Sequence, residues 1–206
     1  LITGEREYKS LFGVTAHELA HSWFHHLLGT NEAKYAWMDE GFTSFYDMLC
    51  EAEILGTEDP YSSFYNRYYQ LVNSGVEEPL TTHADRFQYN FAYGIASYSK
   101  GAVFLAQLGY IIGAENLMKT IKRYYEVFQF SHPTPNDFKR IAEKISGMQL
   151  EWYLNDWVRT TNTIDYGIQQ VEEKGKKTKI TLERIGNMAM PVEVYVEAID
   201  GSSDYY

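Results

Sequence analysis

Two histidines and a glutamate stand close together near the start of this 206-residue chain, in the order His17-Glu18-Leu19-Ala20-His21. This is the HExxH pattern. On a helix, residues four apart lie one above the other, so His17 and His21 can direct both imidazoles at one metal ion. Glu18 would then lie beside that ion, where a carboxylate can act as a general base towards water. The spacing therefore predicts a metal centre with hydrolytic chemistry.

A third protein ligand is expected, because a catalytic zinc site commonly has three such ligands and keeps a fourth position for water. Metzincins supply a histidine six residues after the second one, but here that position is Leu27. The remaining common choice is a glutamate from a second helix. Glu40, in the segment WMDEGF, follows His21 after 18 intervening residues. Asp39 and Glu32 are the alternatives for this third ligand.

Taken together, these motifs resemble the aminopeptidase N family of gluzincins, which includes the leukotriene hydrolase. The similarity rests on HELAHSWF, on the 18-residue spacing to the glutamate, and on the W-x-x-E-G-F setting of that glutamate. A further match lies downstream, where Tyr98-Ser99-Lys100-Gly101-Ala102 is similar to the Y-x-K-G segment of the family. The matches cover about residues 14–105 in the expected order. The glycyl-aminopeptidase family shares much of this pattern and is a close alternative.

The resemblance implies a role for each matching residue. His17, His21 and Glu40 would bind one Zn²⁺ per chain, Glu18 would be the general base, and Tyr98 would donate a hydrogen bond to the transition-state oxyanion. The implied function is that of a zinc-dependent metalloaminopeptidase, which removes N-terminal residues from peptides through a zinc-activated water. The expected partners are therefore peptide substrates. Lys100, next to Tyr98 in the motif, is expected to have a structural role.

Several alternatives remain open at the level of sequence. His25 lies four residues after His21, so a second or displaced metal site is conceivable, but the family tends to have a small residue there. We therefore expect His25 and His26 to be ordinary surface or core histidines. The chain could also be a catalytically inactive binding or scaffold module of the same fold. Epoxide hydrolysis or endopeptidase cleavage at the same metal site is a third possibility.

The elements that position these residues are predicted to be mainly helical. Thr134, Pro135 and Gly147 have the residue types of an N-cap, a first turn and a C-cap, which makes residues 135–146 the clearest helix. A long loop is expected over residues 73–97, where Gly75, Pro79 and Gly94 interrupt the pattern. The other predicted helices cover residues 11–28, 39–55, 59–72, 98–112, 114–128 and 150–158.

After about residue 163 the apolar period changes from 3.6 to 2, which predicts strands. A hairpin is expected around residues 172–177, and a half-buried strand over residues 192–198. The predicted fold class is mainly α: by the resemblance, a thermolysin-like catalytic helical domain over residues 1–162, then the start of a β-sandwich-like domain over residues 163–206. We expect the catalytic domain to lack its upstream part, including the residues that grip the substrate amine.

Composition excludes several classes of function. Lys and Arg number 18 against 28 Asp and Glu, so the net charge is −10, which disfavours binding to nucleic acid and to anionic membranes. No apolar run approaches the ~20 residues that a membrane-spanning helix needs. Cys50 is the single cysteine, which excludes an internal disulfide and a cysteine-based zinc cluster, and we expect it to be buried and inert. Compartment and oligomeric state have no signature in the sequence.

Overall fold

The computed structural model describes residues 4–175, 177–198 and 200–206. It divides into two compact units, of which the first ends at Thr161 and the second covers Asn162–Tyr206. The first unit is helical and the second is made of antiparallel strand pairs. The predicted fold class, a mainly helical domain followed by the first strands of a β region, is therefore confirmed.

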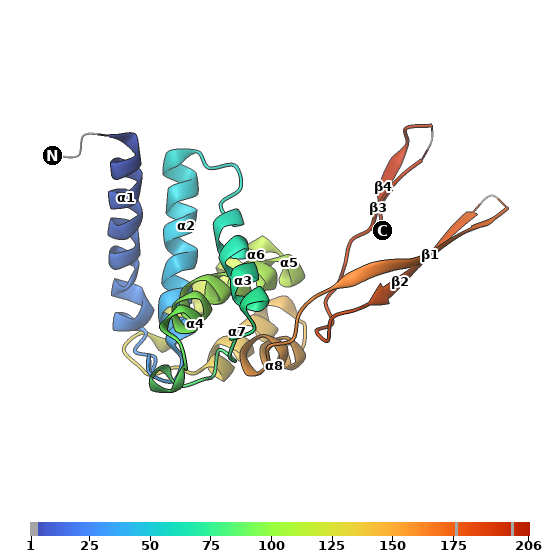
Figure 1. The fold of residues 1–206 in the computed structure, drawn as a ribbon. Coiled ribbons are helices and arrows are strands. Elements are labelled where there is room, and N and C mark those ends of the chain that lie inside the picture. The colour runs from blue at the N-terminus through green and yellow to red at the C-terminus, as the bar shows by residue number, and fades with distance from the viewer. Residues whose placement is uncertain (1–3, 176, 199) are drawn as a thin grey trace. The chain divides into compact units, whose positions relative to one another are not determined.

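The first unit is built from α-helices joined by short helical segments of other types. α1 and α2 lie side by side (Figure 1). Within the described part of the chain, no helix is both long and apolar enough to cross a membrane. The α-helices are α1 (Glu5–Ala20), α2 (Phe42–Leu55), α3 (Ser62–Ser74), α4 (Asn90–Gly94), α5 (Gly101–Ile112), α6 (Ala114–Phe128), α7 (Pro135–Ser146) and α8 (Glu151–Arg159). The other helical segments are η1 (Ser22–Leu27), η2 (Trp37–Gly41), η3 (Ala84–Arg86) and η4 (Ile95–Lys100).

Local sequence signals set the ends of α7. The Thr134 hydroxyl and backbone N–H both donate to the Asp137 carboxylate, and the Asp137 backbone N–H completes a capping box with the Thr134 side chain. Pro135 occupies the first turn, and Gly147 ends the helix in the left-handed conformation at φ 72°. The observed bounds of α7 are those predicted, because each signal acts within a few residues.

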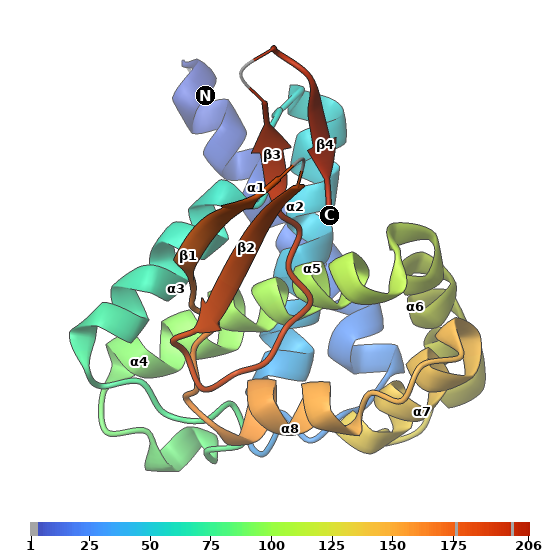
Figure 2. The same cartoon turned by 90° about the vertical axis from the view of Figure 1, so that its right-hand side faces the viewer.

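The core of the helical unit surrounds α5, which Figure 2 shows in the middle of this unit with α3 and α6 on either side. Seven of its residues are buried, which explains why α5 is apolar around most of its circumference. The Phe104 ring on α5 lies 4.9 Å from the Trp37 ring and 5.1 Å from the Tyr153 ring, measured between centroids. Phe104 therefore connects η2, beside the predicted ligand Glu40, to α8 at the far side of the core.

The structure corrects the single helix predicted over residues 11–28. The regular helix begins at Glu5 and ends at Ala20, and Phe24 and His25 have non-helical backbone angles within η1. Two side chains bind the Phe24 carbonyl oxygen: the His21 Nδ1–H donates at 2.8 Å and the Thr43 hydroxyl at 3.0 Å. These bonds replace the helical partner of that carbonyl, so the chain turns just after the second histidine of the motif.

The predicted loop over residues 73–97 is also corrected, because α4 and η4 occupy its second half. Gly94 has ordinary helical angles, φ −61° and ψ −47°, so this glycine is no breaker. Ala92 and Ala96 are fully buried on one side of this segment. Small residues let a helix approach the core closely, and they produce no strong apolar stripe that a periodicity argument could detect.

Cys50 differs from expectation as well. The thiol is exposed on α2 and not buried. Its neighbour Met48 takes the inward position on the helix, at 3% exposure. A shift of two residues on a helix moves a side chain about 200° around the axis, so Met48 and Cys50 face opposite sides.

The second unit contains two antiparallel hairpins. β1 (Tyr166–Lys174) pairs with β2 (Lys177–Arg184), which places a turn within the hairpin predicted around residues 172–177. β3 (Tyr195–Glu197) pairs with β4 (Ser203–Tyr205). The predicted strand over residues 192–198 is thus shorter in the structure, where β3 covers three of its residues and Val194 and Ala198 on either side add backbone hydrogen bonds to Tyr206 and Ser202.

Candidate metal centre

The two histidines of the motif lie at the C-terminal end of α1. Their ring centroids are 4.8 Å apart, and the planes are nearly perpendicular, at 87°. His17 is in the last turn of α1 and His21 is its C-cap residue, so the helical rise of one turn places both rings on the same side. Both side chains are half-buried, at 14% and 15% exposure.

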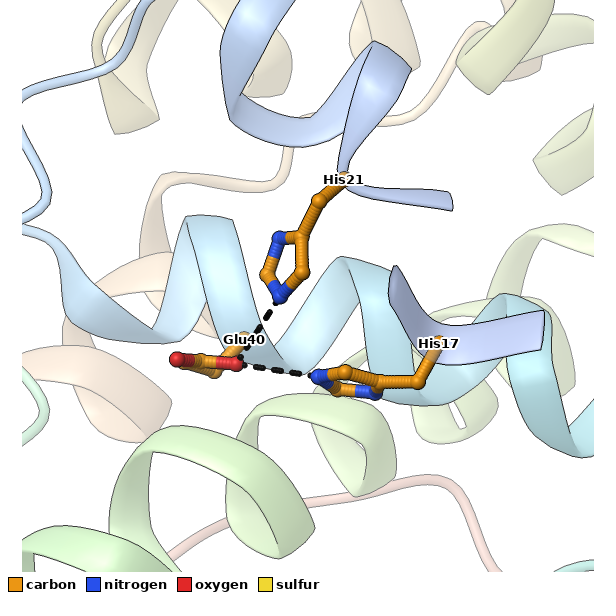
Figure 3. Close-up of side chains that lie close together, drawn as sticks. All are labelled: His17, His21 and Glu40. Carbon is orange, nitrogen blue, oxygen red and sulfur yellow. Dashed lines mark hydrogen bonds and ion pairs between the residues drawn. The ribbon is translucent and has the colours of Figure 1, made fainter. Parts of the chain in front are cut away.

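Glu40 extends towards these rings from η2, as Figure 3 shows. Its Oε2 atom lies 3.2 Å from His17 Nε2 and 3.4 Å from His21 Nε2. Two ligand atoms bound at about 2.0–2.2 Å to a tetrahedral zinc ion are separated by about 3.3–3.5 Å. The three ligand atoms all lie within 4.8 Å of one another. The donor set of two imidazoles and one carboxylate, and the spacing of its atoms, therefore fit a zinc ion.

Groups behind the histidines orient their rings. Asp47 Oδ2 on α2 lies 2.7 Å from His17 Nδ1, and the Phe24 carbonyl oxygen accepts the proton of His21 Nδ1. Donation from Nδ1–H leaves Nε2 as the nitrogen that can bind a metal, once the proton that His17 Nε2 shares with Glu40 in this structure has been displaced. Asp47 was absent from the sequence-based site. Asp47 follows Glu40 by seven residues, which is about two helical turns and places both on the same helical face. This spacing is the signal that could have indicated Asp47.

The charge of the site follows from these contacts. Burial disfavours a charged imidazole, but hydrogen bonds to Asp47 and Glu40 outweigh burial and raise the pKa of His17 to about 9. Burial alone would raise the pKa of Glu40, yet hydrogen bonds with His17 and Tyr98 hold that pKa below its usual range. Glu40 is therefore a carboxylate, the form a metal ligand requires.

Tyr98 lies directly beside this group, on η4. Its ring is stacked on His17, with centroids 5.6 Å apart and planes at 12°, and its hydroxyl donates to Glu40. Burial and the neighbouring Glu40 carboxylate raise the pKa of Tyr98 well above its usual value. The phenol therefore keeps its proton and remains a hydrogen-bond donor at the edge of the site.

A close crossing of two backbones brings Glu40 and Tyr98 together. A Cβ atom built on Gly101 would lie 2.8 Å from the Cα of Gly41 and 3.1 Å from the Trp37 carbonyl oxygen. A Cβ atom built on Gly41 would likewise lie 2.6 Å from the Cα of Gly101. Only glycine fits at both positions, because a real Cβ atom essentially never lies within 3.0 Å of a backbone atom in this way. The glycines of the E-G and K-G motif segments therefore explain how these two helical segments reach contact distance.

Replacement of Gly101 by alanine tests this crossing. The added methyl group would push backbone against backbone, so we expect a loss of about 1–3 kcal/mol in the free energy of unfolding. Zinc affinity should weaken as well, since Glu40 adjoins the crossing. Gly94→Ala is the matched control: its Cβ meets open space and its φ is helical, so its stability should be unchanged or slightly higher. Urea unfolding of both variants would measure the difference, and equal stabilities would contradict the steric account.

The remaining predicted residues are placed as follows. Glu18 is exposed on α1, between the two histidines in sequence. Glu32, an alternative third ligand, is also exposed and is outside both groups of potential ligands found among the described residues. Asp39, the other alternative, is buried and belongs to a second group with His21 and His25. Asp39 therefore lies at the Nδ1 side of the His21 ring, opposite the Nε2 atom that Glu40 approaches, and His25 lies next to Asp39.

Comparison with known proteins places the chain in a family. The model of the Peptidase family M1 domain matches residues 2–157. The chain belongs to peptidase family M1. The resemblance to the aminopeptidase N family noted from the HExxH, W-x-x-E-G-F and Y-x-K-G segments is therefore confirmed.

Individual M1 relatives are similar to this chain at modest identity. Probable aminopeptidase 2 of Sulfurisphaera tokodaii is 28% identical over 177 residues, which is 83% of this chain and 22% of the relative. Glutamyl aminopeptidase of Sus scrofa is 26% identical over 189 residues, which is 88% of this chain and 20% of the relative. The chain thus spans about a fifth of the length of these curated relatives.

Solved M1 structures share the fold. A variant of the M1 zinc metallopeptidase from Deinococcus radiodurans, bound to a Tyr-Ser-Ala substrate, aligns with a TM-score of 0.60 and 22% identity, over 71% of this chain and 32% of that chain. Legionella pneumophila aminopeptidase A in complex with aspartic acid aligns with a TM-score of 0.63 and 16% identity, over 94% of this chain and 22% of that chain. At these identities the likeness establishes the fold alone.

Proposed function

We propose that this chain carries the metal centre of a zinc-dependent aminopeptidase that hydrolyses N-terminal residues from peptides. The observation that carries the proposal is the convergence of His17 Nε2, His21 Nε2 and Glu40 Oε2 at distances suited to one ion. Membership of family M1 and the names of the relatives support the same activity. One zinc per chain is the expected stoichiometry.

Zinc supplies Lewis acidity to such a site: it polarises a carbonyl group and makes a water molecule a stronger acid. Glu18 accepts a proton from the water that attacks the scissile carbonyl carbon, and then passes that proton to the leaving amine. Tyr98 donates its hydroxyl hydrogen to the carbonyl oxygen, which gains negative charge as the tetrahedral state forms. The C–N bond then breaks, and no covalent intermediate with the enzyme is needed.

Three features of the protein prepare its side chains for this reaction. Asp47 and the Phe24 carbonyl hold the histidine rings in the metal-binding tautomer. The raised pKa of Tyr98 preserves its donor hydrogen. Glu18 is exposed, so its carboxylate is accessible to water.

Zinc content measured after dialysis tests the metal centre. We expect about one zinc per chain for the unaltered protein, and Glu40→Ala should weaken binding by more than the roughly 10–100-fold that an outer hydrogen-bond partner contributes. Glu32→Ala is the matched control, since Glu32 is an exposed carboxylate in the segment between η1 and η2, eight residues before Glu40. If Glu32→Ala lost zinc while Glu40→Ala kept it, the ligand assignment would be wrong.

A further inference from the structure

A buried carboxylate lies on the edge of the His21 ring opposite Glu40. The Oδ1 atom of Asp39 is 2.9 Å from His21 Nδ1 and 2.8 Å from His25 Nδ1. The Asp39 side chain is only 8% exposed, whereas His25 is 29% exposed. One carboxylate oxygen is therefore shared by two imidazoles, of which one is a predicted metal ligand and the other has no part in the mechanism above.

This arrangement creates a competition for His21 Nδ1. The Nδ1–H donates to the Phe24 carbonyl oxygen at 2.8 Å, and this bond directs Nε2 towards Glu40. Asp39 Oδ1 lies at nearly the same distance from this nitrogen but accepts no hydrogen bond from any described residue. A carboxylate that was aligned with the N–H would form the stronger hydrogen bond. A buried carboxylate that lacked another partner would draw the N–H of His21 and turn the ring.

His25 supplies that other partner. Its Nδ1 atom lies against the same Asp39 oxygen, so it compensates the buried charge, which would otherwise be costly. We infer that His25 is a positioning residue of the metal centre: through Asp39, it keeps the His21 ring in the orientation that presents Nε2 to zinc. This inference rests on the proposed zinc site and adds to it a residue outside the ligand set.

The distances argue against a second metal ion in this position. Ligand atoms around a tetrahedral zinc ion lie about 3.3–3.5 Å apart. The contacts of Glu40, at 3.2 and 3.4 Å, are close to this separation, whereas those of Asp39 are 2.8 and 2.9 Å. These separations are those of close ion-pair contacts between an imidazole and a carboxylate, although neither contact has the alignment of a hydrogen bond, since Asp39 Oδ1 and His25 Nδ1 have no hydrogen-bond partner among the described residues. A second ion would also require His21 to give up the Nδ1 proton that it donates to Phe24.

The experiment compares zinc binding by His25→Ala, His25→Asn and His26→Ala with the unaltered chain. The side-chain amide of asparagine can place an N–H donor where Nδ1 of histidine lies, so it should replace the contact to Asp39. His26 is an exposed imidazole on the same segment and serves as the matched control. Zinc dissociation constants come from competition with a chelator, and the visible absorption of the Co²⁺-substituted chain reports the geometry around His21.

His25→Ala should weaken zinc binding by about 10–100-fold and alter the cobalt bands, whereas His25→Asn should restore most of both and His26→Ala should change neither. In an Asp39→Asn background, His25→Ala should have little further effect, because the charge to be compensated is gone. Unchanged affinity and spectrum in His25→Ala would overturn the inference and leave the proposed zinc site intact. Two zinc ions per chain, with one lost in His25→Ala, would also overturn the inference and would show instead that His25 is a ligand of a second metal ion. An unaltered chain without zinc would overturn the metal centre itself.

Discussion

Glu18→Gln is expected to lower kcat for peptide hydrolysis by about 10²–10⁴-fold, the usual contribution of a general base, while zinc stays bound. The amide has nearly the shape of the carboxylate but accepts no proton from water. Glu18 belongs to neither group of potential metal ligands found among the described residues, so zinc content should be unaffected. Initial rates on amino-acid p-nitroanilides, measured for the variant and the unaltered protein, give the effect on kcat.

The matched control for this experiment is Glu58→Gln, which alters an exposed glutamate in the turn after α2. Full activity is expected for the control. Full activity in Glu18→Gln as well would refute the assignment of the base. Loss of zinc in Glu18→Gln would instead mean that the carboxylate helps to hold the metal.

Lys100→Met is expected to reduce the free energy of unfolding by about 3–5 kcal/mol, the cost of leaving one charge of a buried pair uncompensated. Lys100 Nζ donates to Glu77 Oε1 at 2.7 Å, and the two side chains are 1% and 7% exposed. The ammonium group also lies 5.6 Å from the centre of the Tyr68 ring, a cation–π distance. Removal of the lysine leaves Glu77 buried without its cation.

Thermal or urea unfolding measures this loss, and a double variant separates charge from packing. Lys100→Met combined with Glu77→Leu should recover much of the stability, because no buried charge remains. Lys119→Met, which breaks an exposed pair with Glu115, is the control and should cause no measurable change. If Lys100→Met were as harmless as this control, the buried pair would have no structural role.

Most of the helical framework is readable from local sequence signals. Gly147, for example, marks the end of a helix that the structure places at the same residue. The His17–His21 pair follows directly from helical geometry, since both lie on one turn. Local rules failed where tertiary contacts took over: Thr43 binds the Phe24 carbonyl and interrupts the helix after His21. Such a contact joins residues 19 apart, beyond any periodicity.

The predicted ligands could be named from the sequence, but the residues that support them could not. The residues for zinc binding could be named from motif spacing, and their roles remain predictions. Asp47 was missed because an acidic residue on an amphipathic helix is ordinary unless its neighbour is known. The Asp39–His25 contact was missed for a related reason: the sequence presented Asp39 as a competing ligand, whereas the structure places it behind His21.

The touching glycines at positions 41 and 101 have a mechanical consequence. Backbones in direct contact leave no side chain between them that could change rotamer, so Glu40 and Tyr98 belong to one stiff body. The crossing therefore fixes the spacing between the backbone segments that carry Glu40 and Tyr98. His17 and His21 come from the end of α1, so a displacement of α1 relative to η2 would move both histidines together away from Glu40.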